Sequence, residues 1–173
     1  MNEVLRAIEG RRSIRGYGPG QMSKDELQLL LKAALESPSA RNLQPWHFSV
    51  VQNKTLLDEI EAEVCEKTSR EAGSIFFGAP TVIFISADET SMYGGIDSGI
   101  AVQTLSLAAH SLGLGSVILG MPRAAFEGEN ADRFEKALKF PKGYKFRIAL
   151  AVGHPAVTKD AHEIGENKID IIQ

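Results

Sequence analysis

The sequence predicts an α+β fold with helices on both faces of a central sheet. Four apolar runs, at residues 46–52, 81–85, 117–119 and 145–152, have the composition of β-strands. Segments whose apolar residues recur at helical spacing lie between these runs. Because strands and helices do not alternate regularly, we expect a sandwich of helices and sheet and not a doubly wound parallel sheet.

Length and composition restrict the class of protein. The chain has 173 residues, which suits a single domain over residues 1–173. The formal net charge of -3 argues against nucleic-acid binding, since nucleic-acid-binding domains usually carry a basic excess. No apolar run approaches the roughly 20 residues that span a bilayer. The single cysteine, Cys65, forms no intrachain disulfide, which fits a reducing compartment. We therefore expect a cytoplasmic protein that binds neither nucleic acid nor membrane.

The first part of the chain predicts three helices. Residues 2–9 have apolar positions on one helical face. Ser23 and Glu26 have the spacing of a capping box, which predicts a helix from this point to about Glu36. Asn53 follows the first predicted strand and is a suitable N-cap for a third helix.

The rest of the chain predicts a buried strand followed by a long helix. Residues 67–79 are ambiguous. The run 81–85 is apolar throughout, so we expect this strand to be buried on both faces. Residues 94–112 are apolar around most of the helix, which implies burial on most sides. Residues 124–138 predict one or two short surface helices before the last strand.

Three arginines lie close together directly after the first predicted helix. Arg11, Arg12 and Arg15 have guanidinium groups that bind phosphate in a bidentate manner and stay charged at any working pH. Ser13 adds a hydroxyl that can donate to a phosphate or a ribityl group. The cluster therefore indicates a phosphorylated ligand, although a solvated surface is an alternative for the cluster taken alone.

A second polar segment, residues 38–46, suits a flat heterocycle. Asn42 and Gln44 can donate and accept at once, which matches the alternating carbonyl and N–H groups of a flavin pyrimidine edge. Ser39 adds a hydroxyl. The alternative interpretation is a turn. For Trp46 we favour a structural role as a core anchor, because tryptophan at a strand start usually packs.

Together these segments resemble the nitroreductase family of flavoproteins. Four segments match the family pattern in order and are spread over most of the chain. They are Arg11-Arg12-Ser13-x-Arg15; Pro38-Ser39-Ala40-x-Asn42-x-Gln44-Pro45-Trp46; Asp97-x-Gly99-x-Ala101 running to Leu107-Ala108-Ala109 and Gly113-Leu114-Gly115-Ser116; and Val152-Gly153-x-Pro155. The resemblance implies a nitroreductase-like fold, with a central mixed, mainly antiparallel sheet flanked by helices.

The resemblance also implies an FMN cofactor bound at the subunit interface of a homodimer. Two groups of residues would hold the cofactor from one chain, and a third group would reach the flavin from the partner. The phosphate and ribityl end would be held by Arg11, Arg12, Ser13 and Arg15. The isoalloxazine ring would lie against Leu119 and Gly120, where glycine permits close backbone approach. The partner would supply Pro38, Ser39, Ala40, Asn42 and Gln44.

The long helix carries a pattern that suits an interface between helices. Gly95 and Gly99 lie four residues apart and hence on one face, where small residues permit close approach. One interpretation is tight packing within the chain, and the other is the dimer interface that the resemblance implies. Asp97 suits the first turn of a helix, and we assign it no catalytic role.

The chain departs from the family pattern at its C-terminus and beside the flavin. Lys159 is the candidate for the basic group that reaches the FMN phosphate in family members, and a solvated surface lysine is the alternative. The tail could instead cross onto the partner, with Ile169, Ile171 and Ile172 as anchors. Residues 67–79 are the candidate covering element for the flavin.

The resemblance implies an oxidoreductase that passes a hydride from NADH or NADPH through FMN to a small-molecule acceptor such as a nitroaromatic or a quinone. No side chain needs to act as an acid or base, because the cofactor carries the chemistry. The four histidines and one cysteine lack metal-ligand spacing, so no metal site is expected. Two alternatives remain open: a related flavin enzyme that performs reductive dehalogenation or flavin fragmentation, and a non-catalytic flavin-binding module.

Overall fold

The protein forms an α+β sandwich around one four-stranded sheet. The structure, a computed structural model, describes residues 2–173. The elements in chain order are α1 (Glu3–Gly10), α2 (Lys24–Leu35), η1 (Ala40–Asn42), β1 (Trp46–Val51), α3 (Lys54–Thr68), β2 (Thr81–Asp88), α4 (Gly94–Ser111), β3 (Gly115–Leu119), η2 (Met121–Phe126), α5 (Ala131–Ala137) and β4 (Tyr144–Gly153).

The sheet confirms the expected mainly antiparallel arrangement. Its strand order is β1-β2-β4-β3, and each of the three neighbouring pairs is antiparallel. The parallel component is an isolated bridge between Ser13 and Ser116, which attaches the segment after α1 to β3. β1 and β3 are therefore the two outer strands, with β2 and β4 between them.

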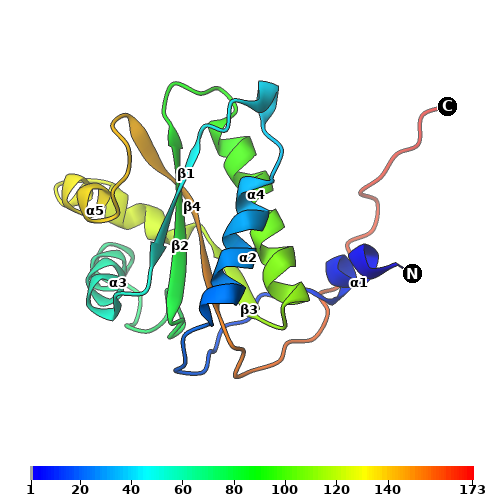
Figure 1. Cartoon of the computed structure of the whole chain (residues 1–173), viewed down its shortest axis with the longest axis horizontal. Coiled ribbons are helices and arrows are strands. Elements are labelled where there is room, and N and C mark those ends of the chain that lie inside the picture. Colours follow the sequence, from blue (N-terminus) through cyan, green and yellow to red (C-terminus); the bar gives the residue numbers. More distant parts are fainter. Residues whose placement is uncertain (1) are drawn as a thin grey trace.

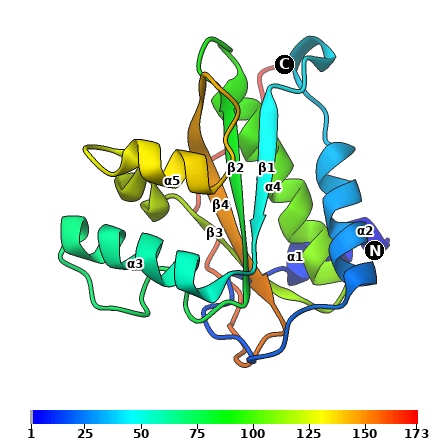
Figure 2. The ribbon, with the colours of Figure 1, turned by 60° about the vertical axis from the view of Figure 1, so that its left-hand side comes forward.

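Helices cover both faces of the sheet, as expected. Figures 1 and 2 show α3 and α5 on one face and α2 and α4 on the other. β2 lies between two hydrophobic clusters: Phe84 points into the cluster with α3, and Ile83 and Ile85 point into the cluster with α2 and α4. All three side chains have no exposed surface. A strand buried on both faces explains why the run 81–85 has no polar alternation.

The local start signals for two helices are confirmed. The Ser23 hydroxyl accepts from the Glu26 N–H while the Glu26 carboxylate accepts from the Ser23 N–H, which completes the capping box of α2. The Asn53 side chain accepts from the Leu56 N–H at the start of α3, at 3.2 Å. Short-range polar patterns thus fix where both helices begin.

Two segments differ from the sequence expectation in their burial. α4 buries only the side that faces the sheet and α2, because Gly95, Ile96, Gly99 and Ile100 on its outer side are exposed. The helix is therefore not buried on most sides within one chain. Residues 124–138 contain the end of η2 and the whole of α5, but Phe134 of α5 is buried in the core and 1% exposed.

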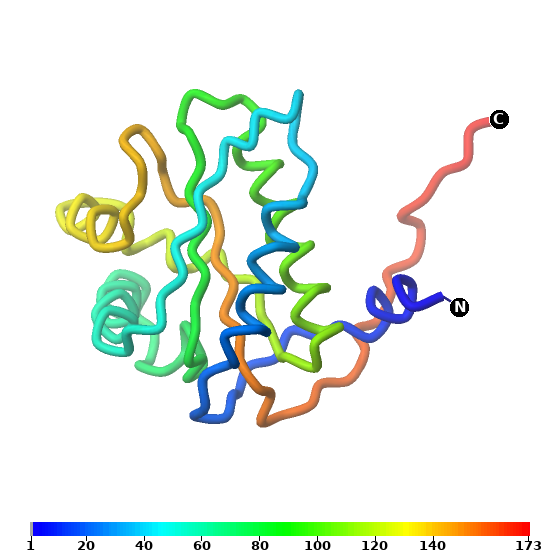
Figure 3. The backbone as a smooth tube through the Cα atoms, viewed as in Figure 1, coloured from blue at the N-terminus to red at the C-terminus, as the bar shows by residue number. Residues whose placement is uncertain are grey.

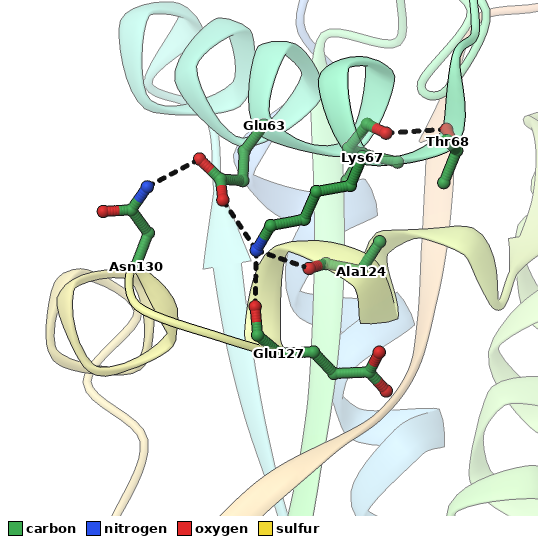
Figure 4. A network of polar contacts seen from close by, with 7 residues as sticks. Glu63, Lys67, Thr68, Ala124, Glu127 and Asn130 are labelled. Atoms are coloured by element: carbon green, nitrogen blue, oxygen red, sulfur yellow. Dashed lines mark hydrogen bonds and ion pairs between the residues drawn. The ribbon is translucent and has the colours of Figure 1, made fainter.

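A lysine in α3 attaches this helix to the segment that follows β3. Figure 4 shows the Lys67 ammonium donating to the backbone carbonyls of Ala124 and Glu127, while it also pairs with Glu63 at 2.7 Å. The Glu63 carboxylate accepts from the Asn130 side chain at 2.8 Å. This group, which we call the Lys67 clamp, links α3 to η2 and to the start of α5.

Both ends of the chain project from the body in the view of Figure 3. α1 exposes Val4, Leu5 and Ile8, so its apolar face has no cover within the chain. Residues beyond Pro155 have no regular secondary structure, and the isoleucines of this tail are at least four-fifths exposed. Within residues 2–173, no helix has the length and apolar character needed to cross a membrane.

Candidate functional site

A basic cavity lies where α1, the last turn of α4 and the start of β3 meet. Its volume is about 310 Å³. Arg11, Arg12 and Lys159 line this cavity together with His110, so the structure brings the candidate Lys159 to the arginine cluster. The lining residues within the described part of the chain include no Asp or Glu. A cavity with three basic side chains and no carboxylate favours an anionic ligand.

Backbone contacts bring the residues after α1 close to β3. The Ile14 N–H donates to the Ser116 carbonyl at 2.9 Å. A Cβ on Gly115 would lie 3.0 Å from both Ile14 and Pro155, so glycine is what allows these segments to approach. Ser13 is held beside Ser116 by the same bridge.

A half-buried tyrosine secures this arrangement. The Tyr17 hydroxyl donates to the Ile14 carbonyl at 2.8 Å and lies 3.2 Å from the Ala151 carbonyl. Burial raises the pKa of Tyr17 far above its ordinary value, with Arg15 opposing the shift. The phenol therefore keeps its proton and remains a donor at any physiological pH.

Arg12 is available to an anion, whereas Arg15 points elsewhere. The Arg12 guanidinium donates to the carbonyls of Glu9 and Arg11, at 2.5 and 2.9 Å, and pairs with no carboxylate of residues 2–173. The Arg15 guanidinium instead lies over the Phe77 ring, 5.7 Å from its centroid, and does not line the cavity. Phe77 belongs to the segment 67–79, whose Ile75 is fully buried in the core.

The segment 38–44 forms a tight loop at the other end of α4. The Gln44 N–H donates to the Ser39 hydroxyl, and the Gln44 side chain donates to the Asn42 side chain, both at 3.0 Å. Arg41, Asn42 and Gln44 all have positive φ, between 48° and 55°. Non-glycine residues in this region are uncommon and collect at functional sites, because the surrounding structure must hold them there.

Asp97 holds this loop, a role that the sequence pattern did not predict. Its Oδ1 accepts from the Ala40 N–H at 3.1 Å, and its side chain is almost completely buried. Its Oδ2 is buried and has no partner among the described residues. The sequence showed only that Asp97 stands in the first turn of a helix. It did not indicate the contact with Ala40, which lies 57 residues away.

The outer strand β3 ends at Leu119, and Gly120 follows it directly. Leu119 is buried, whereas Gly120 is exposed and has no heavy atom within 4 Å of the position of a Cβ. Beyond Leu119, β4 has no β3 neighbour. Arg147 lies on this stretch of β4, and its Nε is buried without a partner in residues 2–173. The backbone at Gly120 is therefore open to solvent, and a flat ring could contact it without a side chain in the way.

One chain keeps the two halves of the expected site apart. The loop 38–44 contacts Asp97 in the first turn of α4, and the basic cavity contains His110 in the last turn. Thirteen residues of helix separate these positions, which is about 20 Å. The loop leads into β1 and the cavity adjoins β3, and these outer strands lie roughly 14 Å apart across three strand spacings.

The residues present fit FMN at the basic cavity and along β3. Arg11, Arg12 and Lys159 suit a phosphate, and the exposed backbone at Gly120 suits the face or edge of a flat ring. Among residues 2–173, no group of three or more His, Cys, Asp or Glu side chains could hold a metal ion. Trp46, in contrast, is buried in the cluster with α2 and α4, as its interpretation as a core anchor predicted.

Known proteins share both the sequence and the fold. A protein of Archaeoglobus fulgidus, whose name assigns it provisionally to NADH dehydrogenase or NAD(P)H nitroreductase, is 34% identical over 169 residues, which is 94% of this chain and 91% of that protein. The FMN reductase [NAD(P)H] of Bacillus subtilis is 30% identical over 90% of this chain and 67% of its own length.

A solved structure has the same fold over its whole length. The crystal structure of a nitroreductase with bound FMN from Desulfitobacterium hafniense has a TM-score of 0.95 and 35% identity, with complete coverage of both chains. Residues 8–154 match the model of the Nitroreductase family. The match includes the arginine cluster, the loop 38–44 and β3. The chain belongs to the Nitroreductase family.

Proposed function

We propose that this protein is an FMN-dependent oxidoreductase that transfers electrons from NADH or NADPH to a small-molecule acceptor. The observation that carries the proposal is the basic cavity of Arg11, Arg12 and Lys159. This cavity lies at the start of β3, and the exposed backbone of Gly120 follows the other end of the same strand. Membership of the Nitroreductase family and the bound FMN of the Desulfitobacterium hafniense structure support it.

The complete site is a composite of two chains. Two copies packed antiparallel through the exposed side of α4, at Gly95 and Gly99, would place the first turn of one α4 beside the last turn of the other. That arrangement brings the loop 38–44 of one chain to the basic cavity of its partner. It also covers the exposed Ile96 and Ile100, which is what an interface of small and apolar residues requires. The proposed assembly is therefore a homodimer with two FMN sites.

The chain contributes binding and orientation to the reaction. When bound, FMN accepts a hydride from the nicotinamide and returns two electrons to the next substrate. Arg11, Arg12 and Lys159 neutralise the phosphate, and Ser13 with the Gly120 backbone sets the position of the ribityl chain and ring. Reduction of a quinone in this way consumes one NAD(P)H and one proton and yields NAD(P)⁺ and the hydroquinone. No side chain has to move a proton in this scheme.

Residues 1–173 form one functional domain in this proposal, with Met1 outside the described residues. Because a chain with one cysteine forms no intrachain disulfide, the proposed location is the reducing cytoplasm. The proposed acceptor is a small molecule such as a nitroaromatic or a quinone.

Rapid mixing tests this function directly. The FMN-loaded protein should be mixed with NADH or NADPH without oxygen in a stopped-flow instrument, and then with a nitroaromatic or quinone. The proposal expects flavin reduction by the nicotinamide and reoxidation by the acceptor, with the reduced acceptor found by mass spectrometry. Loss of halogen from an aromatic substrate, or fragments of FMN, would indicate the other flavin chemistries. A bound flavin that neither nicotinamide reduces would indicate a binding module.

A further inference from the structure

We propose that a second cavity, which we call the Arg41 cavity, is the acceptor site and selects flat aromatic acceptors that carry a negative charge. The inference rests on the proposed function and adds the chemical class of its acceptor. The cavity has a volume of about 520 Å³. It is formed by the loop 38–44, the start of β4 and the connection from β2 to α4, which lie at the same end of the molecule in Figures 1 and 2.

The walls of the Arg41 cavity suit an aromatic ring. Tyr93 and Tyr144 supply two aromatic side chains, and Leu43 and Met92 supply apolar surface. Leu43 and Met92 are 64% and 84% exposed, so their apolar surface is available to a ligand. Aromatic rings gain from offset or edge contacts with tyrosine, and the methionine thioether adapts to an adjoining ring.

Two features attract an anion to the same cavity. Arg41 pairs with no carboxylate of residues 2–173, and its φ of 54° is maintained by the tight loop around it. The start of α4 is the second feature. Its N-cap residue, Tyr93, makes no side-chain cap and lines the cavity, so the positive end of an 18-residue helix lies at the cavity wall, where the Asp97 carboxylate in the same first turn offsets part of its charge.

One carboxylate lines the cavity, and its charge is partly compensated. The Oδ1 of Asp88 accepts from both the N–H and the hydroxyl of Thr90, at 2.9 and 2.8 Å. These bonds lower the pKa of Asp88, and the charge of Arg147 acts in the same direction. Asp88 is therefore ionised, and one of its two oxygens already accepts two hydrogen bonds from Thr90. Its charge weakens the attraction of an anion without removing the two positive features.

The Arg41 cavity adjoins the proposed flavin contacts through a shared loop. Arg41, Leu43 and Pro45 line the cavity, whereas Asn42 and Gln44 bond to each other on the loop that the composite site brings to the flavin. A ligand held by Arg41 therefore lies beside these contacts, and its reducible group must extend past the loop to touch the ring. Acceptor and cofactor would share the loop that Asp97 holds in place.

A pair of matched acceptors tests this inference. 4-Nitrobenzoate and 4-nitrobenzamide have nearly the same shape and differ in charge. The FMN-loaded protein should be compared with R41Q and R41K, and with R123Q as a control, because Arg123 is an exposed arginine paired with Glu127 away from the cavity. The measurements are kcat/KM for each acceptor and the Kd of 4-nitrobenzoate for the oxidised protein by calorimetry.

R41Q should lower the ratio of kcat/KM for 4-nitrobenzoate to kcat/KM for 4-nitrobenzamide by roughly fivefold, the size of one partly exposed charge interaction. It should also weaken 4-nitrobenzoate binding, whereas R41K should retain the ratio and R123Q should leave it unchanged. A ratio that R41Q leaves unchanged, or equal effects of R41Q and R123Q, would overturn the inference. A protein that binds 4-nitrobenzoate through Arg41 but is not reduced by either nicotinamide would instead contradict the proposed function alone.

Discussion

At the phosphate end of the proposed site, Arg12 is the arginine whose loss we expect to weaken FMN binding. Its guanidinium lines the basic cavity and is held by two backbone carbonyls without a competing carboxylate. Arg12→Ala should weaken FMN binding by about tenfold to a hundredfold, since a hydrogen bond to a charged group contributes roughly 1.5–3 kcal/mol. The measurement is a dialysis titration of FMN, with Arg123→Ala as the exposed control. Full flavin occupancy in the Arg12 variant would show that the phosphate lies elsewhere.

Sequence patterns singled out several residues that the structure brings together, but not all of their partners. Arg11, Arg12 and Lys159 lie together in the cavity, and the loop 38–44 has unusual backbone geometry at three of its residues. The contact of Asp97 with Ala40 was beyond prediction, because it joins two residues that are 57 positions apart. Arg147 was likewise inconspicuous, since a lone basic residue in a strand has no local signature.

At the level of elements, the Lys67 clamp holds the segment that leaves β3 at Gly120. Lys67→Met keeps most of the length of the side chain and removes its charge and its bonds to two carbonyls of that segment. We expect a loss of about 1–2 kcal/mol in the free energy of unfolding. Lys54→Met is the matched control in the same helix, because Lys54 pairs with Asp58 in a largely exposed position and should contribute less than about 0.5 kcal/mol. The measurement is chemical denaturation.

The effect of the clamp should depend on pH. The bond from Lys67 lowers the pKa of Glu63 in the folded state, with a further contribution from Asn130. A lowered folded-state pKa stabilises the fold above the unfolded pKa of about 4.3, and this stabilisation is lost as the pH falls through the folded value. The difference between Lys67→Met and the unmodified protein should therefore be full at neutral pH and narrow below about pH 4. A difference that stays constant over this range would show that Glu63 takes no part.

Elements with local signals were the best predicted from sequence. The capping box of Ser23 and the N-cap of Asn53 depend on residues three apart, and both are present as expected. The burial of α4 was misjudged, because an apolar helix gives the same pattern whether its cover comes from its own chain or from a partner. The burial of Phe134 was missed for another reason. A short helix that is polar on most sides has the pattern of a surface helix even when it buries one large side chain.

At the scale of the whole molecule, the proposed site exists only between two chains. Mixing two inactive variants tests this arrangement. Arg12→Ala disables the cavity half, and the double substitution Asn42→Ala with Gln44→Ala disables the loop half. Each homodimer would then have two defective sites, whereas a mixed dimer would contain one intact site beside one doubly altered site.

Unfolding and refolding the two variants together should restore tight FMN binding to about one quarter of all sites, assuming random pairing. Restoration no greater than in either variant alone would indicate a site within one chain.

The central claim is that this chain binds FMN and reduces it with a nicotinamide. The most direct measurement is the visible absorption spectrum of the purified, FMN-loaded protein before and after NADH or NADPH is added without oxygen. We predict flavin absorption with about one FMN per chain, and loss of that absorption on addition of at least one of the two nicotinamides. A protein that takes up no added FMN, or whose bound flavin keeps its absorption with both nicotinamides, would contradict the claim.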